Sequence, residues 1–308
     1  MRVFPLLSVV LFVLSSQVLA QDPKEIAAED PKLFLETMRN IKKWDEPAEP
    51  MKIVGPVHFV GTKGLGVWLI TTSEGHILLN TGMPGSGRMI EASIRKLGFK
   101  PEDIKLLLAC HAHIDHVAGH AQIKKTSGAK VVMMREEVEL LESGGKLDFH
   151  YGKVADFEFE AVKVDQMIQD EDTVKLGDVT LTARRTSGHT KGATTWITKV
   201  VEDGKNYTVV FPDGSGVNPG YHLVKDPSYP GIADDYRRTL GVLEKLKPDI
   251  WLAPHIETFD FEGKRARAAK EGVKAWVDPE GYQKWVTGER EKFDAALKAE
   301  TKEPSKGK

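Results

Sequence analysis

Apolar and polar positions divide the chain into short hydrophobic runs and longer amphipathic segments. Short aliphatic runs beside turn residues predict strands, and apolar positions three or four residues apart predict helices. The predicted strands are 57–60, 65–72, 76–79, 104–109, 130–134, 173–176, 179–184, 193–199, 207–211 and 249–253. The predicted helices are 31–44, 89–97, 116–126, 135–142, 232–246, 264–276 and 282–297. Because strands lead into helices in both halves, the order favours two packed sheets with helices on both outer faces.

The start of the chain has the pattern of a secretory signal. Arg2 supplies a positive charge, residues 3–14 form an apolar run, and Ala20 offers a small residue for cleavage. The run is too short to span a membrane. We therefore expect residues 1–20 to be removed and the mature protein to be periplasmic or otherwise exported. The expected remaining parts are an N-terminal helix and linker at 21–50, the main domain at 51–298 and a disordered basic tail at 299–308.

Composition excludes some classes of partner. Of 308 residues, 41% are hydrophobic and 29% charged, which is ordinary for a globular protein. The net charge of -2 gives no general attraction to nucleic acid or to anionic lipid, so we expect neither as a partner. The single cysteine, Cys110, cannot form an intramolecular disulfide and is expected to be a core residue facing away from His111. The sequence does not specify an oligomeric state.

Candidate chemistry is concentrated at residues 111–116, which read His-Ala-His-Ile-Asp-His. They lie between a predicted strand and a predicted helix, where open α/β folds place their sites. His111 and His113 are two residues apart in an extended segment, so they can bind one ion together. Asp115 and His116 follow where the chain bends and can face a second ion. Imidazole and carboxylate ligands suit zinc better than iron or manganese. The alternative is that Asp115 only caps a helix and the histidines are surface residues.

Two further histidines have the same placement. His189 and His255 each follow a predicted strand by a short turn, as His111 does. With them there are six candidate ligands, three for each of two ions. The other histidines lack this placement and are interpreted as structural or exposed: His58, His76, His120, His150 and His222.

These motifs resemble a known family. The pattern His-x-His-x-Asp-His is the signature of the metallo-β-lactamase superfamily, and the flanking sequence resembles class B β-lactamases of the third subclass, whose second zinc is held by Asp-His-His. The resemblance extends from Trp44 to about Leu297 and implies a four-layer αββα sandwich. The flanking motifs are at 60–62 (Val-Gly-Thr), 188–196, 219–221 (Pro-Gly-Tyr) and 278–282 (Asp-Pro-Glu-Gly-Tyr).

The resemblance implies a site and an activity. His111, His113 and His189 would bind the first zinc, and Asp115, His116 and His255 the second. A hydroxide shared by the two ions would attack the lactam carbonyl, with Asp115 as the catalytic residue that orients it. The implied function is an exported di-zinc β-lactamase that opens the amide bond of penicillins, cephalosporins and carbapenems.

Several positions leave alternatives open. Asn80 stands where the superfamily usually has aspartate, in a turn that braces the motif. Ser215 is the candidate for binding the substrate carboxylate, with Lys191 as a second candidate. Asp213 would bridge the metals in the alternative function, a lactonase or thioesterase-like hydrolase of the same fold. A non-enzymatic periplasmic zinc-binding protein is disfavoured, because a storage site would saturate its ions with protein ligands.

Overall fold

The computed structural model describes residues 30–302, so the predicted signal peptide at 1–20 lies outside the described residues. None of the helices in this part of the chain is both long enough and apolar enough to span a membrane.

A seven-stranded sheet forms the first half of the fold. The strands from β1 to β4 are antiparallel, and those from β4 to β7 are parallel. Its strands lie side by side in chain order: β1 (Met51–Val54), β2 (Val57–Phe59), β3 (Trp68–Thr72), β4 (Gly75–Leu79), β5 (Ile104–Leu108), β6 (Lys130–Met134) and β7 (Gln166–Ile168).

A five-stranded sheet forms the second half. It is antiparallel except where β12 joins β11 in parallel. Its order is β12 (Ile250–Trp251), β11 (Lys205–Phe211), β10 (Thr194–Glu202), β9 (Val179–Arg185) and β8 (Thr173–Leu176).

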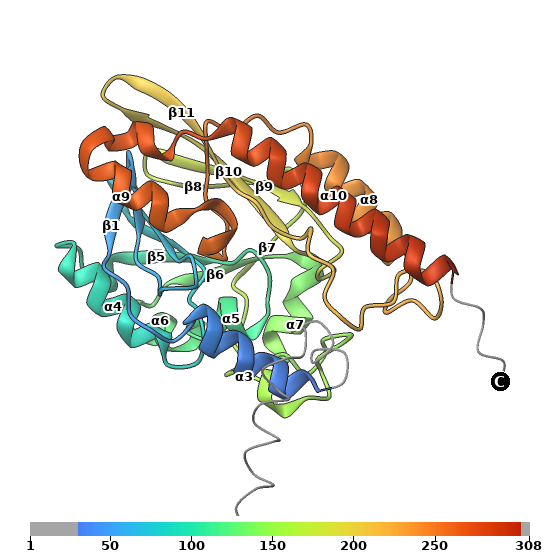
Figure 1. Ribbon diagram of the computed structural model, residues 1–308. Helices are drawn as coiled ribbons and strands as arrows, with labels where there is room; N and C mark the ends of the chain where they lie inside the picture. Colours follow the sequence, from blue (N-terminus) through green and yellow to red (C-terminus); the bar gives the residue numbers. More distant parts are fainter. Residues whose placement is uncertain (1–29, 303–308) are drawn as a thin grey trace, which may run out of the picture.

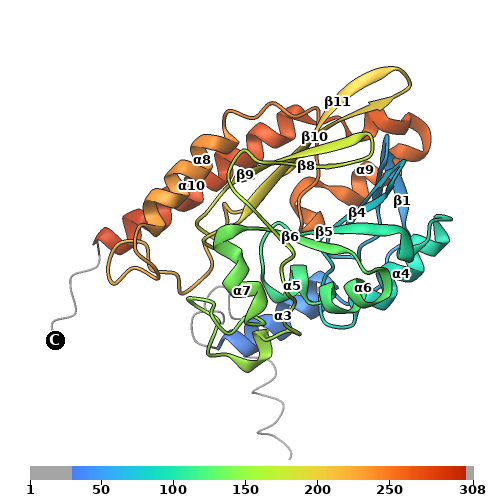
Figure 2. The same ribbon diagram turned by 180° about the vertical axis from the view of Figure 1, so that it is seen from behind.

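Helices cover the outer faces of both sheets, α4 and α6 on the first and α8 and α10 on the second (Figures 1 and 2). The helices are α3 (Pro31–Lys42), α4 (Ser86–Lys96), α5 (Ile114–Val117), α6 (His120–Ser127), α7 (Val138–Glu142), α8 (Ile232–Leu243), α9 (Phe261–Glu271) and α10 (Pro279–Lys302). Shorter 3-10 turns are η1 (Pro101–Asp103), η2 (Arg135–Glu137), η3 (Ala155–Phe157), η4 (Ile256–Phe259) and η5 (Gly272–Trp276). This confirms the predicted αββα sandwich.

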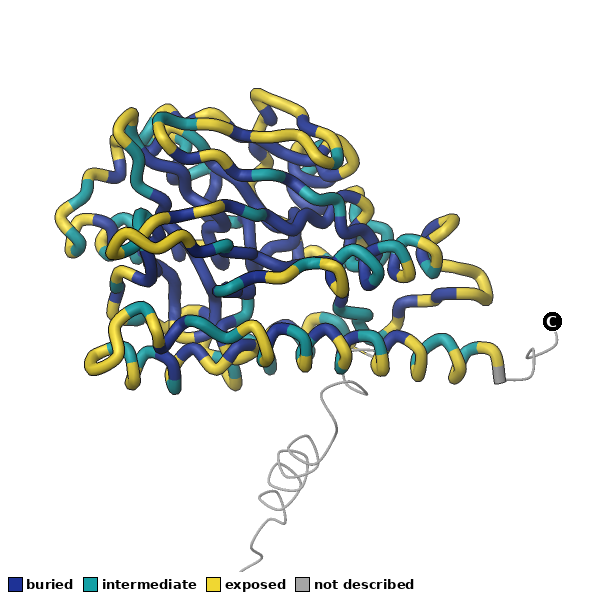
Figure 3. The backbone as a smooth tube through the Cα atoms, turned by 90° about the horizontal axis from the view of Figure 1, so that it is seen from above, coloured by how far each residue is buried: buried dark blue, intermediate teal, exposed yellow. Residues whose placement is uncertain are grey.

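The first sheet is buried on both faces. Trp68 and Ile70 of β3 point into the core between the sheets, whereas Leu69 packs against Ile90 and the other apolar residues under α4 and α6. Figure 3 shows the central strands as the buried part of the molecule. Burial on both faces explains why these strands read as continuous aliphatic runs rather than as alternating patterns.

Two short strands, β1 and β7, were not predicted. Of the residues in β7 only Ile168 is buried, and β1 buries Ile53 and Val54. Because they contain so few apolar residues, β1 and β7 form strands only by pairing with a neighbouring strand, β2 and β6 respectively. Strands of four and three residues such as these carry little local signal.

The helix predicted at 116–126 is two helices, α5 and α6. The chain breaks at Gly119, where an added Cβ would lie 2.6 Å from the backbone oxygen of Thr81. The amide of Ala118 donates to the carbonyl of Gly82 in the same contact. This packing of the motif against the turn after β4 ends the first helix, and the sequence of the helix alone does not show it.

The predicted disordered tail begins too early. Helix α10 continues to Lys302, into the segment predicted as 299–308. The carboxylate of Glu300 accepts hydrogen bonds from the amides of Leu223 (2.8 Å) and Val224 (2.9 Å). These bonds tie the end of the helix to a loop far away in the sequence, so composition alone could not place the boundary.

Candidate metal centre

Residues 111–116 form the loop after β5 and the first turn of α5, as predicted. Asn80 braces this loop: its Oδ1 accepts the amide of Cys110 at 2.9 Å, and its backbone has a φ of 65°, which asparagine tolerates. The expected bracing role of Asn80 agrees with this contact. Cys110 is buried in the core between the sheets, as predicted.

Glu137 joins two loops of the site. Its carboxylate is buried and accepts the amide of Ala112 at 2.8 Å and the amide of Gly192 at 2.7 Å. Burial raises the pKa of this carboxyl above its usual value. The loop that carries His113 is thereby fixed to the loop that carries His189. Glu137 cannot be identified from the sequence, because a lone glutamate after β6 carries no local signal of such contacts.

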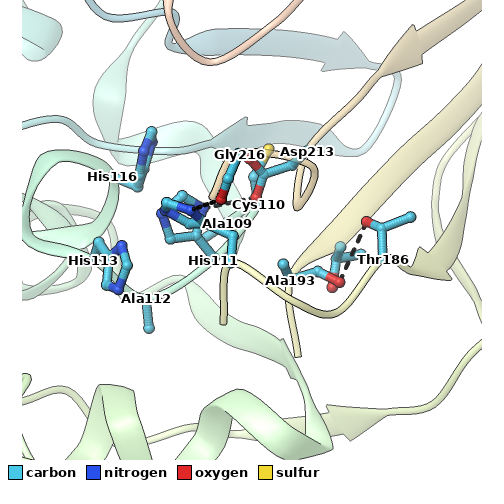
Figure 4. Close-up of polar contacts among 12 residues, drawn as sticks. Ala109, Cys110, His111, Ala112, His113, His116, Thr186, Ala193, Asp213 and Gly216 are labelled. Carbon is cyan, nitrogen blue, oxygen red and sulfur yellow. Dashed lines mark hydrogen bonds and ion pairs between the residues drawn. The ribbon is translucent and has the colours of Figure 1, made fainter. Parts of the chain in front are cut away.

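His111, His113 and His189 form the first group of candidate ligands. Each offers one nitrogen, and these nitrogens lie within 4.8 Å of one another. The ring centroids are 4.6 Å apart for His111 and His113 and 4.9 Å apart for His113 and His189. In Figure 4, His111 lies between His113 and His116 on one side and Asp213 on the other.

Every imidazole in the first group has a partner on one of its two nitrogens, which leaves the other for a ligand. Nδ1 of His111 lies 2.7 Å from Oδ2 of Asp213, and Nε2 of His113 lies 3.1 Å from Oδ2 of Asp148. Nδ1 of His189 lies 2.8 Å from the carbonyl oxygen of Gly216. Nε2 of His111 is buried without a hydrogen-bond partner among the described residues. A buried, unpaired nitrogen pointing at two other imidazoles fits a metal ion.

Asp115, His116 and His255 form the second group. Oδ2 of Asp115 lies 3.1 Å from Nε2 of His116 and 3.4 Å from Nε2 of His255. The contact with His116 is close but is not aligned as a hydrogen bond, which fits two ligands of one ion. His111 joins Asp115 and His116 within the same 4.8 Å, so the two groups are adjacent. His255 is the most exposed member of this group, with a side chain 32% accessible. Its ring packs against Trp44, with 5.4 Å between the two ring centroids.

The electrostatics favour the metal-binding form at His111, His189 and Asp115, whereas at His113 they favour the protonated imidazole. Burial, together with the neighbouring imidazoles, lowers the pKa of His111 well below its usual value, and burial lowers the pKa of His189 to about 3. For His113 burial acts the same way, but Asp148 outweighs it and raises the pKa. Burial opposes ionisation of Asp115, but the adjacent imidazoles outweigh it and lower its pKa. An ionised carboxylate and imidazoles without a proton on one nitrogen are the forms that bind metals.

Two cavities open beside these groups. The larger, of about 360 Å³, is lined by His111, His189 and His255 and by part of α10. The smaller, of about 270 Å³, is lined by His113, Asp115 and an apolar wall. That wall consists of Phe34, Leu35, Met38, Trp44, Tyr151 and Phe157. The N-terminal helix α3 is therefore part of the site.

The remaining predicted site residues lie in different places. Ser215 lines the larger cavity, but its hydroxyl donates to Oε2 of Glu289 at 3.0 Å. Lys191 lines a separate pocket, with its Nζ 5.7 Å from the ring centre of Tyr229. The role of Ser215 toward a substrate stays a prediction. The five histidines predicted to be structural or exposed line neither cavity.

Asp213 contacts His111 instead of lying between the two groups. The turn at Gly214, which has a φ of 88°, brings Asp213 to this position. Gly214 lies so close to Thr186 that an added Cβ would be 1.7 Å from the carbonyl oxygen of Thr186. Burial raises the pKa of the Asp213 carboxyl to about 7. Asp148 makes the equivalent contact with His113, and its Oδ1 also accepts two backbone amides. Asp148 is not among the residues predicted from the sequence, because its only local signal is a polar loop after two glycines.

Comparison with known proteins decides the family. Residues 67–255 match the metallo-β-lactamase superfamily, and this match contains all six candidate ligands. The chain belongs to the metallo-β-lactamase superfamily. Membership implies the use of divalent metal ions and confirms the predicted family.

Solved structures of this superfamily resemble the chain over most of its length. The native FEZ-1 metallo-β-lactamase of Legionella gormanii is 41% identical, with a TM-score of 0.82, and the match covers 84% of this chain and 98% of that one. BJP-1 of Bradyrhizobium japonicum, a subclass B3 metallo-β-lactamase, is 40% identical, with a TM-score of 0.79 and coverage of 85% and 98%. These matches confirm the resemblance to the third subclass and the predicted class of hydrolase.

Curated relatives match over a shorter region. An N-acyl homoserine lactonase of Bacillus cereus is 31% identical over 100 residues, which is 24% of this chain and 39% of that protein. The chain thus spans well under half the length of these relatives, and the shared region shows common ancestry rather than a common substrate.

Proposed function

We propose that the protein is an exported di-zinc β-lactamase that hydrolyses the amide bond of β-lactam antibiotics. The observation that carries the proposal is the convergence of six ligand side chains in two adjacent groups at the edge of a substrate-sized cavity. The likeness to FEZ-1 and BJP-1 over more than four fifths of the chain supports the choice of substrate class.

Each group would hold one zinc ion. His111, His113 and His189 would bind the first ion and leave a position open, as catalytic zinc sites do. Asp115, His116 and His255 would bind the second, whose ligand set contains no sulfur. When bound, the ions supply Lewis acidity for the lactam carbonyl and lower the pKa of a water toward about 7.

The protein's own residues orient the reactants. Asp115 lines the smaller cavity, so its ionised carboxylate can accept a hydrogen bond from the attacking water. The partners on the far nitrogens of His111, His113 and His189 fix the imidazoles before substrate arrives. The apolar wall around Trp44 can bury the substituents of the lactam ring and exclude water from that side.

Export forms a separate part of the proposal and rests on residues 1–20. N-terminal sequencing of the protein recovered outside the cytoplasm should begin near Gln21. Recovered protein that still begins at Met1 would contradict it.

The alternative is hydrolysis of a lactone or thioester in the same fold, which the similarity to the Bacillus cereus lactonase favours. In that function Asp213 would bridge the two ions. The carboxylate of Asp213 is instead 2.7 Å from the far nitrogen of His111, which supports the β-lactamase.

The deciding experiment compares substrates on one preparation. Purified mature protein with measured zinc content is given a penicillin, a cephalosporin, a carbapenem and an N-acyl homoserine lactone side by side. We expect β-lactam turnover that a chelator abolishes, that added zinc restores, and that inhibitors acylating a serine leave unchanged. Turnover of the lactone alone would replace the proposal with its alternative, and an active preparation with one zinc per chain would reduce it to a single-ion site.

A further inference from the structure

One cation lines the two cavities beside the metal centre, within the part of the chain that the structure describes. It is Lys292 of α10, which lines the larger cavity together with His111, His189 and His255. The carboxylates lining this cavity are Asp213 and Glu289. An anionic substrate that enters it therefore meets a single positively charged side chain.

Lys292 is held by a buried carboxylate. Its Nζ lies 2.7 Å from Oε1 of Glu289, one turn earlier on α10, while 71% of the Lys292 side chain remains accessible. The Glu289 side chain is only 10% accessible. An ammonium group has three donors, and Glu289 takes one, so the others are available in the cavity.

Ser215 forms a hydrogen bond with the same carboxylate. Its hydroxyl is 3.0 Å from Oε2 of Glu289 and acts as the donor, since a carboxylate only accepts. The serine then presents lone pairs to the cavity, and these repel a second carboxylate. Ser215, the first candidate from the sequence for binding the substrate carboxylate, therefore has no proton to donate to it.

We propose that Lys292, positioned by Glu289, binds the ring carboxylate of the β-lactam substrate. This inference rests on the proposed function and names the residue that selects for that substrate group. Penicillins, cephalosporins and carbapenems carry this carboxylate next to the lactam nitrogen, on the side away from the substituent of the four-membered ring. The substrate would thus place its carboxylate toward α10 and its substituent toward the apolar wall of the smaller cavity.

The test compares a chromogenic cephalosporin with its methyl ester, which lacks the negative charge. Lys292→Gln should raise KM for the free acid about five- to tenfold and leave KM for the ester unchanged, because one charge-assisted contact is lost. Lys292→Arg should restore most of the acid's KM. Lys298→Gln removes a charge from the exposed surface of the same helix, outside both cavities, and should change neither substrate.

A second variant separates substrate binding from a purely structural role. Glu289→Gln keeps an oxygen that can accept from Lys292 but removes the negative charge that opposes an anionic substrate. It should therefore lower KM for the free acid about threefold and leave the ester unaffected. Equal changes for acid and ester in the Lys292 variants would mean that Lys292 only neutralises Glu289, and the inference would fall. Acid-selective loss in Ser215→Ala with none in Lys292→Gln would return the role to Ser215. If the wild-type protein hydrolyses neither compound, the proposed function fails instead.

Discussion

The two groups of candidate ligands differ in how the protein holds their side chains. Each imidazole of the first group has its own partner, Asp213, Asp148 or the carbonyl of Gly216. In the second group, His116 and His255 share one contact, Oδ2 of Asp115.

The two groups also differ in how the loops that carry them are joined. His113 and His189 of the first group lie on the two loops that Glu137 joins. The second group ends in His255, whose side chain is 32% accessible and which borders both cavities, as His189 of the first group does. A pre-organised set of ligands loses less freedom when an ion binds, so we expect the first group to bind zinc more tightly and the second to lose it first.

The largest expected effect comes from removing one ligand of each group. His189→Ala and His255→Ala should each lower β-lactam turnover by several orders of magnitude at limiting zinc, because each leaves an ion with two protein ligands. Zinc content and turnover are measured together. His255→Ala should keep the first ion, whereas His189→Ala should lose it. A variant whose zinc content does not change would remove that histidine from the assignment.

Partners of the ligands give the next largest effect. Asp148→Asn should weaken binding of the first zinc about ten- to hundredfold, as loss of such a partner commonly does. One carboxylate oxygen of Asp148 accepts from His113 and the other accepts two amides, and an amide side chain cannot replace both. Competition with a chromogenic chelator measures the affinity. The matched control is Asp156→Asn, whose side chain is 40% accessible and pairs with Lys32.

These partners show what the sequence could and could not predict. The histidines were identifiable because each follows a strand end, and β6 was predicted with its observed bounds, Lys130–Met134. Asp148 and Glu137 were not, because their contacts join segments 35 and 25 residues apart. Local sequence patterns indicate the secondary structure of a segment, whereas the packing of the two sheets determines which loops come into contact.

The same limit applies to the residues at which helices begin and end. The break between α5 and α6 depends on Thr81, and the end of α10 depends on amides near Leu223. In both cases a tertiary contact decides the boundary. The helix at 31–44 is predicted, but its place in the cavity wall is not, because amphipathic helices look alike whether they cover a core or a site.

A smaller effect should come from His120, which supports the second group from behind. Its Nδ1 lies 2.7 Å from Oγ1 of Thr81, whose amide also donates to the carbonyl of His116 at 2.6 Å. Burial lowers the pKa of His120 to about 3. Since the unfolded chain binds this proton near pH 6.5, the stabilisation is complete above that pH and is lost as the pH falls toward 3.

For the metal-free protein, this linkage predicts a loss of about 2 kcal/mol of unfolding free energy from His120 between pH 7 and pH 5. Denaturant titrations at both values measure it. His120→Gln should show a loss smaller by this amount, and His222→Gln, at an exposed histidine, should behave as wild type. Identical pH dependence in wild type and His120→Gln would show that His120 does not titrate in this way.

The smallest effect should come from Asp213→Asn, which also tests the choice between the two functions. The carboxylate of Asp213 faces Nδ1 of His111, the nitrogen away from the metal group, and the asparagine oxygen can accept the same hydrogen bond. We therefore expect the variant to retain two zinc ions and β-lactam turnover within about tenfold of wild type. Asp115→Asn serves as the contrast, because it removes charge from a ligand and should lose the second ion. If Asp213→Asn loses a metal while Asp148→Asn does not, Asp213 bridges the ions. A lactone or thioester would then replace the β-lactam as the proposed substrate.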